Sequence, residues 1–390
     1  MQRVVFAALA LGACAVCAAQ APQDVPWTPL FNGKDLSGWV EVGGGKWTVQ
    51  NGEIIGETGD GRYGWLCTER SFADFVLELK FKIEGPGNSG VQFRSHVIDG
   101  VMYGYQCDVH PKDKRTGWIY EERTGRKWLA RNPDAPDVLK LDDWNTLRIS
   151  MIGEHIKTEL NGATIVELDD ERTVSGIIAL QVHQGKTPVR VRWKDIRIKD
   201  LGYGPGWKSL FNGKDLSGWR KYGEERWEVR DGVIVGSAVT GKYGYLGTER
   251  SFKNFILRLK FKPEGPGNSG VFFHAAIAGT EIKGIQAEVE PRIGGHTGGL
   301  YETGGRGWLA QPDPVAEKLL RPNDWNELRL KVQGKRITTH LNGFRMVDFV
   351  DPEPRFTEGI IALQLHSGGQ AKMLWRDIYI IELPDGPEGG

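Results

Sequence analysis

The chain has no net charge and no long apolar run. Its 390 residues carry 50 Lys plus Arg against 50 Asp plus Glu. A chain balanced in this way has no overall field that would attract nucleic acid or an anionic membrane surface. No stretch approaches the roughly 20 apolar residues that a transmembrane helix needs. We therefore expect neither a nucleic-acid partner nor a membrane-spanning segment.

Well-known catalytic fingerprints are also missing. The sequence has no H-E-x-x-H, G-x-S-x-G or P-loop motif, and no Rossmann fingerprint in a strand-to-helix context. Turns account for the glycines at 43–45 and 85–90 better than phosphate binding does. Zinc proteases, α/β-hydrolases and nucleotide-binding enzymes are therefore not indicated.

The N-terminus is typical of a processed leader. Residues 1–21 combine Arg3, a short apolar core and a small-residue cleavage site, Ala19-Gln20-Ala21. An alternative is lipoprotein processing, because the residues up to Cys14 resemble a bacterial lipobox that would leave a lipid anchor there. We expect export to the periplasm or the extracellular space by one of these routes.

The rest of the chain is a tandem repeat. The run LFNGKDLSGW occurs at 30–39 and again at 210–219, and the turn EGPGNSGV begins at Glu84 and again at Glu264. We predict one unit at 26–200 and a second at 209–384. A Gly/Pro-rich linker at 201–208 joins them, and a disordered tail at 385–390 follows.

Cysteine is scarce, with four residues in the chain. Without the leader only Cys67 and Cys107 remain, and the second unit has Gly247 and Ala287 in their places. Loss of both together favours a disulfide between Cys67 and Cys107 in an oxidising compartment. Two independent buried thiols explain the same pattern, so both interpretations stay open.

Apolar residues alternate with a period of two, and no stretch is convincingly helical. Residues 75–83 place Phe75, Leu77 and Phe81 on one face and charged side chains on the other. Asn-Gly and Asp-Gly pairs at 51–52, 161–162, 231–232 and 342–343 are typical of tight hairpins. We predict two tandem all-β domains, each an antiparallel β-sandwich or jelly roll.

The same alternation predicts which polar side chains share the outer face of a sheet. In the first unit these are Gln92, Arg94, His96, Gln106, Asp108, His110, Gln181 and His183. In the second unit they are His274, Gln286, Glu288, Glu290, Gln364 and His366. A solvated face alone would also be polar, but it tends to collect lysine, glutamate and threonine. Histidine, glutamine, arginine and short carboxylates are better suited to binding hydroxyl groups or moving protons.

Two rim loops repeat a charged and aromatic pattern. The residues are Tyr120, Glu121, Arg126 and Trp128 in the first unit, and Tyr301, Glu302, Arg306 and Trp308 in the second. Such a set suits an aromatic-walled sugar site, and the chain's 14 tryptophans point the same way. A structural ion pair on an exposed loop explains the charges equally well.

A divalent metal is a further candidate. Asp108 and His110 are two residues apart on one strand face and could share an ion with His183 or Glu121. The second unit has Glu290 at the place of His110. The spacing is therefore only suggestive, and the metal stays open.

The motifs together resemble the 3-keto-disaccharide hydrolase family. They are LFNGKDLSGW, W-x-V-x-(N/D)-G-x-(I/V)-(I/V)-G, GNSGV, a G-x-Q-x-(D/E)-V strand, LNG and a closing W-(K/R)-D-I, and each occurs twice. The resemblance implies a concanavalin-like lectin/glucanase jelly roll in each unit. It also implies an exported protein that acts on glycosides oxidised at C3, with a hydrolase or lyase outcome.

The activity so implied needs a base, a group that stabilises an enolate, and an acid for the leaving group. As a hypothesis we assign His183 or Asp108 as base, and Arg94 or a metal on His110 as enolate stabiliser. Glu121 is the hypothetical acid. The units differ at Arg94, Asp108 and His110, so they need not both react. Two alternatives are non-catalytic carbohydrate-binding modules and a purely structural sandwich.

Overall fold

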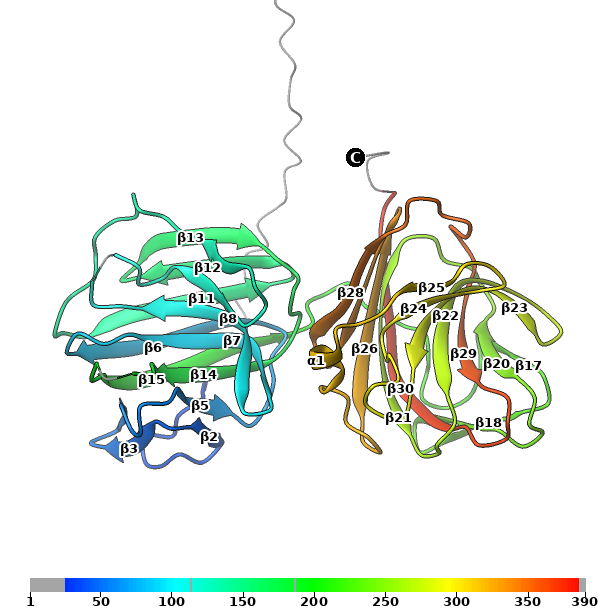
Figure 1. Ribbon diagram of the computed structural model, residues 1–390, viewed down its shortest axis with the longest axis horizontal. Helices are drawn as coiled ribbons and strands as arrows, with labels where there is room; N and C mark the ends of the chain where they lie inside the picture. Colours follow the sequence, from blue (N-terminus) through cyan, green and yellow to red (C-terminus); the bar gives the residue numbers. More distant parts are fainter. Residues whose placement is uncertain (1–24, 113, 186, 386–390) are drawn as a thin grey trace, which may run out of the picture.

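The computed structural model describes residues 25–112, 114–185 and 187–385, and it is built almost entirely of antiparallel strands. The predicted leader, Cys14 and residues 386–390 of the predicted tail lie outside these residues. Figure 1 shows two sandwiches side by side, one for each unit. Among the described residues, no helix has the length and apolar character needed to cross a membrane.

Each unit stacks two sheets, which we call the base sheet and the pocket sheet. In the first unit the base sheet has the order β13-β12-β11-β6-β15-β4-β3, with β1 also on β15, and the pocket sheet has the order β10-β9-β8-β7-β14-β5-β2. The strands are β1 Thr28–Pro29, β2 Trp39–Gly43, β3 Lys46–Gln50, β4 Glu53–Glu57, β5 Gly64–Thr68, β6 Asp74–Glu84, β7 Ser89–Ile98, β8 Val101–Val109, β9 Ile119–Glu122, β10 Lys127–Ala130, β11 Asn145–Ile152, β12 His155–Leu160, β13 Ala163–Asp169, β14 Ile177–Val182 and β15 Arg190–Gly202.

The second unit repeats this architecture. Its base sheet has the order β18-β19-β30-β21-β26-β27-β28, with β16 on β30, and its pocket sheet has the order β17-β20-β29-β22-β23-β24-β25. The elements are β16 Lys208–Ser209, β17 Trp219–Tyr222, β18 Arg226–Arg230, β19 Val233–Ser237, β20 Gly244–Thr248, β21 Phe255–Pro263, β22 Ser269–Ala278, β23 Glu281–Val289, β24 Leu300–Thr303, β25 Gly307–Ala310, α1 Pro314–Glu317, β26 Asn326–Gln333, β27 Arg336–Leu341, β28 Phe344–Val350, β29 Ile360–Leu365 and β30 Lys372–Glu382. The prediction of two tandem antiparallel β-sandwiches is confirmed. The short helix α1 was not expected.

The core of each unit lies between its two sheets. On β6, Phe75, Leu77 and Phe81 are fully buried, whereas Glu78 and Lys80 are half-buried on the opposite face. The hairpin between β3 and β4 turns at Asn51 and Gly52, both with positive φ, as a two-residue turn of this kind requires. Strand alternation and turn chemistry therefore account for the layers.

Cys67 and Cys107 are both free and buried, so the disulfide interpretation is wrong and the alternative of two independent buried thiols holds. They lie on β5 and β8, which are separated in the pocket sheet by β14 and β7. Cys107 packs into the core, whereas Cys67 packs with Trp65 and Met102 in a cluster on the opposite face of the sheet. Two thiols on opposite faces of one sheet cannot bond, because their Cβ atoms point apart.

The two units meet along a backbone-paired seam. Thr173 of the first unit forms a β-bridge with Phe344 at the start of β28. The Val174 N–H donates to the Gly343 carbonyl oxygen at 2.8 Å. Lys331 of the second unit forms ion pairs with Glu154 and Glu171 of the first. The linker is short: β15 continues through Gly202, and β16 begins at Lys208.

Candidate functional site

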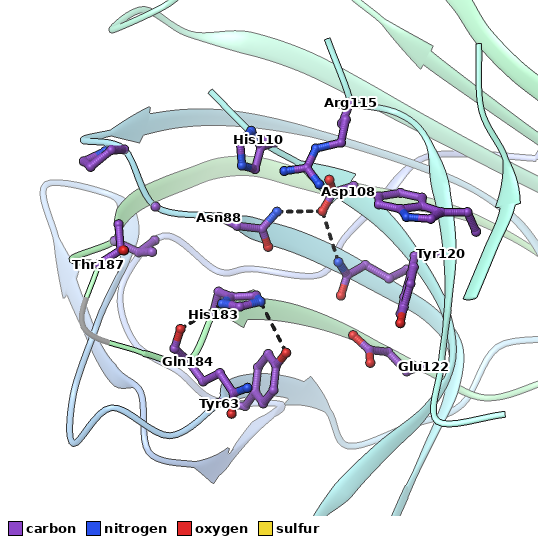
Figure 2. Close-up of a pocket in the computed structure, with 15 residues that line it drawn as sticks. Tyr63, Asn88, Asp108, His110, Arg115, Tyr120, Glu122, His183, Gln184 and Thr187 are labelled. Atoms are coloured by element: carbon purple, nitrogen blue, oxygen red, sulfur yellow. Dashed lines mark hydrogen bonds between the residues drawn. The ribbon is translucent and has the colours of Figure 1, made fainter. Parts of the chain in front are cut away.

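A pocket of about 410 Å³ opens on the outer face of the first pocket sheet (Figure 2). Strands β8, β9 and β10 contribute to it, together with the GPGN turn before β7 and the residues that precede β5 and follow β14. The polar and aromatic side chains that line it include Tyr63, Asn88, Gln106, Asp108, His110, Arg115, Tyr120, Glu122, Trp128 and His183.

Side chains alternate between the two faces of the sheet along β8 and β9, and every second one faces the pocket. On β8, Tyr105 and Cys107 enter the core, so Gln106 and Asp108 face the pocket. On β9, Tyr120 and Glu122 line the pocket. The Tyr120 ring meets Trp128 of β10 edge to face at 5.1 Å between ring centroids. These two rings form an aromatic wall of the kind that packs against a sugar ring.

The hydrogen bonds of His183 define its tautomer. Its Nδ1 lies 2.8 Å from the Gln184 carbonyl oxygen, which can only accept, so a neutral ring carries its proton on Nδ1. Nε2 lies 3.2 Å from the Tyr63 hydroxyl and in that tautomer accepts a hydrogen bond from it. Figure 2 shows the ring beside Tyr63 within the pocket. In the neutral ring, the acceptor nitrogen of His183 therefore lies on the pocket side.

Asp108 heads an amide network on the pocket floor. Its Oδ1 accepts from the Asn88 side chain at 2.8 Å and from Gln106 at 3.2 Å. Gln106 in turn accepts from Gln92 at 2.6 Å and from Gln181 at 2.7 Å. Gln181 is therefore a buried support beneath the pocket, and it is not among the residues that line it.

Burial raises the pKa of Asp108, while Asn88 and the nearby charges of Arg115 and His110 act in the opposite direction. The second carboxylate oxygen of Asp108 is buried and has no hydrogen-bond partner within the protein. A buried acceptor without a partner is costly. A donor supplied by a ligand would remove that cost.

Glu122 is a second pocket carboxyl, and the sequence reasoning missed it. Burial raises its pKa and the Asp108 charge adds to the rise, whereas Arg123 and the amides of Gln181 and Gln92 oppose it. Its place follows from Tyr120 by a two-residue step along one strand. The two-residue spacing from Tyr120 therefore indicated Glu122. The prediction named Glu121 instead, because Glu121 recurs in the second unit as Glu302.

Arg94 does not face the pocket, contrary to the prediction. It is 1% exposed, and its guanidinium donates to Asp74 at 2.7 Å and to the carbonyl oxygens of Ala73 and Gly153. Its backbone has φ 42°, and the pairing of β7 with β8 shifts between Phe93 and His96. This β-bulge breaks the alternation, so Arg94 points to the opposite side of the sheet.

The same correction applies to His274 in the second unit. It has φ 47° within a matching register shift on β22. Both ring nitrogens lie beside carbonyl oxygens, of Phe356 at 3.0 Å and Lys253 at 2.6 Å. His274 is therefore a buried structural residue, not a wall of the second pocket.

Glu121 and Arg126 form a structural ion pair away from the pocket. Glu121 is 1% exposed and accepts from Arg126 through two bonds of 2.6 Å, and Arg126 also pairs with Asp170. Arg306 of the second unit is held in the same way by Glu302 and Asp351. The structural interpretation of the rim charges therefore holds, and these four predicted site residues tie down the β9–β10 and β24–β25 hairpins.

A second pocket of about 540 Å³ occupies the equivalent place in the second unit. Seven predicted residues line it: Gln286, Glu288, Glu290, Tyr301, Trp308, Gln364 and His366. His366 repeats the histidine arrangement, with Nε2 at 3.1 Å from the Tyr243 hydroxyl and Nδ1 at 3.1 Å from the Ser367 carbonyl oxygen.

The two pockets differ in several side chains. Gln92, Asp108, His110, Arg115 and Glu122 of the first unit are replaced by Phe272, Glu288, Glu290, His296 and Thr303. Phe272 is fully buried and packs with Tyr245, and Thr303 removes a carboxyl group. Burial, together with the charge of Glu290, raises the pKa of Glu288 to about 7.

The described part of the chain contains no group of three or more His, Cys, Asp or Glu side chains that could hold a metal ion. His110 lines the first pocket, and its Nδ1 lies 2.7 Å from the Lys112 carbonyl oxygen. Asp108, His110 and one of the two proposed third ligands, His183, line the pocket, whereas the other, Glu121, points away from it.

Comparisons with known proteins match both units. A relative from Bacteroides thetaiotaomicron named 3-keto-disaccharide hydrolase is 35% identical over 96 residues, which are 22% of this chain and 33% of that protein, so the match spans a third of the relative's length. A solved Parabacteroides distasonis structure, described provisionally as a glycosyl hydrolase, is 22% identical over 46% of this chain and 94% of its own, with a TM-score of 0.36. The carbohydrate-binding module CBM66 of Bacillus subtilis is 20% identical over 42% of this chain and 95% of its own, with a TM-score of 0.35.

The family model for the 3-keto-alpha-glucoside-1,2-lyase-like domain matches residues 26–199 and again residues 206–381. The two matches cover most of the chain and coincide with the two sandwiches. The chain belongs to the family of 3-keto-alpha-glucoside-1,2-lyase-like proteins and carries two copies of that domain in tandem.

Proposed function

We propose that the first unit cleaves 3-keto-glycosides by removing the C2 proton and expelling the C1 substituent. The observation that carries this proposal is the placement of His183 Nε2, the acceptor nitrogen of the neutral ring, in one pocket with two carboxyl groups of raised pKa. The family match and the name of the Bacteroides relative support the substrate class.

The reaction follows from the ketone. A carbonyl at C3 acidifies the hydrogen at C2, so a base can take that proton and leave an enolate. Collapse of the enolate breaks the C1–O bond, and the electron pair leaves on the glycosidic oxygen, which takes up a proton. Addition of water across the resulting enone then gives a hydrolysis product. Release of the enone without addition of water gives a lyase product. His183 Nε2 is the base, because it is an acceptor in the neutral ring.

Glu122 replaces Glu121 as the acid. A raised pKa keeps a carboxyl protonated at higher pH, which a group that donates a proton to a leaving oxygen requires. Tyr120 and Trp128 bind the sugar's apolar face, and the unpartnered oxygen of Asp108 accepts from a sugar hydroxyl. Arg115 takes over the role once assigned to Arg94, because its cation lines the pocket and can face an enolate oxygen.

The second unit is proposed to bind sugar without turning it over. It keeps the Tyr243–His366 pair, Gln286 and the aromatic wall of Tyr301 and Trp308, but Thr303 removes the acid. Glu288, the remaining carboxyl of raised pKa, is held on the pocket floor by Asn268 and Gln286 and does not stand at the place of Glu122. A base without an acid at that place is poorly suited to expel an alkoxide. We further propose that the protein is exported, on the strength of the leader-like residues 1–21.

Isotope labelling tests the reaction. The full chain is incubated with a 3-keto-disaccharide carrying deuterium at C2, and product formation is followed by mass spectrometry. We expect a primary isotope effect on turnover and loss of the label from the released enone. The unoxidised disaccharide should give no product. Cleavage of the unoxidised sugar at a similar rate, or turnover without any C2 isotope effect, would rule out the proposed chemistry.

A further inference from the structure

The floor of the second pocket is rich in acceptors and poor in donors. Glu288 accepts from Asn268 and from Gln286, the latter at 2.7 Å. Glu290 accepts from the same Asn268 amide nitrogen at 2.8 Å. One amide group therefore bridges two carboxyl groups that stand side by side on the pocket side of the sheet.

Neither Glu288 nor Glu290 is held by an ion pair in the described part of the chain, and Arg292, which lines the same pocket, is exposed. In the first pocket, the charges of Arg115 and His110 are close enough to Asp108 to oppose the rise that burial causes in its pKa. In the second unit, Glu290 stands at the position of His110. His296 stands at the position of Arg115, and its Nδ1 lies 3.0 Å from the Glu317 carboxylate.

Two further acceptors on this floor have no partner. Gln364 lines the pocket and is 3% exposed, yet its side-chain oxygen has no hydrogen bond, and the same is true of the buried Asn268 oxygen. A buried unpaired acceptor costs roughly 1–3 kcal/mol, a cost that a bound donor removes. The unpaired oxygens are an observation independent of the acidic pair. Both observations favour a ligand that donates hydrogen bonds.

We propose that the second pocket binds a sugar bearing a protonated amine, with its ammonium group between Glu288 and Glu290 and its ring against Tyr301 and Trp308. An ammonium group has three N–H donors, which can bond the unpaired acceptors, and one positive charge, which can pair with the carboxylates. The two aromatic rings meet edge to face at 5.3 Å between centroids, so one apolar wall is already assembled. Arg292, which also lines the pocket, is exposed to solvent at its edge.

This ligand class deepens the binding role proposed for the second unit and rests on that role, but it does not rest on the reaction of the first unit. The preference for an amino sugar should be confined to the second pocket. The first pocket has Glu122 and Asp108 as well, but its cation Arg115 disfavours an ammonium ligand.

Calorimetric titration of the full chain at pH 7 tests the proposal with three matched probes. They are methyl glucosaminide, methyl N-acetylglucosaminide, which lacks the charge, and methyl glucoside. We expect the glucosaminide to bind at least about tenfold more tightly than the other two, as charge-assisted hydrogen bonds of about 1.5–3 kcal/mol imply.

Glu290→Gln preserves shape and removes the charge from a half-buried residue, so it should fold normally and lose the preference. Glu249→Gln removes the charge of an exposed carboxyl of the same unit outside the pocket, so this control variant should keep the preference. Equal affinity for all three probes, or a preference that survives Glu290→Gln, would overturn the amine proposal. Equal affinities would leave the binding role intact, whereas absence of saturable binding to any probe would overturn both.

Discussion

One hydrogen bond to a backbone carbonyl oxygen sets the tautomer of the neutral histidine in each pocket. The Gln184 carbonyl oxygen holds the proton of a neutral His183 on Nδ1 and so leaves Nε2 as the acceptor. Ser367 does the same for His366. The proposed base is therefore present in both pockets, whereas the proposed acid Glu122 has Thr303 as its counterpart in the second unit.

The acid role of Glu122 predicts a dependence on the leaving group. Glu122→Gln should lower kcat/KM by about 10²-fold or more on a 3-keto-disaccharide, whose alkoxide needs a proton. The same variant should lose far less on a p-nitrophenyl 3-keto-glucoside, because that leaving group departs as a stable anion. Equal losses on both substrates would contradict the role.

The pH profile follows from the same carboxyl. Burial raises the pKa of Glu122, so the protonated form persists above the ordinary range and is lost as the pH rises through the raised pKa. For the disaccharide, kcat/KM should therefore fall on the alkaline side. The p-nitrophenyl substrate serves as the control and should lack this alkaline limb.

Much of the residue-level account could be predicted from sequence, within clear limits. Period-two alternation placed Gln106 and Asp108 on the pocket face, and the structure puts them there. The sequence could not tell that Glu121 would pair with Arg126, because the fold brings in Asp170 as a second carboxylate that holds Arg126 in place. The adjacent Glu122, on the opposite face of the same strand, lines the pocket.

At the scale of the element, β7 and β22 show where alternation fails. Arg94 and Ser95 together lie opposite the single residue Gly104 of β8. A Cβ on Gly104 would lie 2.7 Å from the Ser95 hydroxyl oxygen and 2.8 Å from its Cα, so only glycine fits. Glycine inside a strand can mark a bulge. Gly104 and its counterpart Gly284 therefore indicate a bulge in the sequence itself, and a bulge makes the alternation that predicted the side of Arg94 fail.

The bulge predicts that Arg94 serves stability and not turnover. Arg94→Met leaves Asp74 buried without its ion-pair partner, which should lower the free energy of unfolding by about 3–5 kcal/mol. Urea unfolding measures this loss. The double variant with Asp74→Asn should lose less than the sum of the two single variants. The kcat/KM of folded Arg94→Met should match that of the native chain, and a large drop without a stability change would restore Arg94 to the site.

At the scale of the molecule, the two sandwiches are joined through a seam and not only through the linker. Phe344 packs against His96 and Tyr103 of the first unit, and buried His340 lies 2.7 Å from the Glu171 carbonyl oxygen. Figure 1 shows β28 on the side that faces the first unit. Since both polar and apolar contacts cross the seam, we expect the two units to unfold together.

The hairpin glycines provide a matched test of the seam. A Cβ on Gly343 would lie 2.2 Å from the Ser175 hydroxyl oxygen across the seam, whereas a Cβ on the equivalent Gly162 would meet nothing within 4 Å. Both have positive φ, so Gly→Ala adds similar backbone strain at either site. In calorimetry, Gly343→Ala should split unfolding into two transitions, and Gly162→Ala should only shift it. Identical behaviour of the two variants would argue against coupling through the seam.

The central claim is that the first unit carries the reaction and the second does not. It is tested most directly by measuring kcat/KM on a 3-keto-disaccharide for the full-length His183→Ala and His366→Ala variants side by side. We predict a loss of at least about 10²-fold for His183→Ala and a change of no more than about twofold for His366→Ala. Equal losses in both variants, or a loss only in His366→Ala, would contradict it.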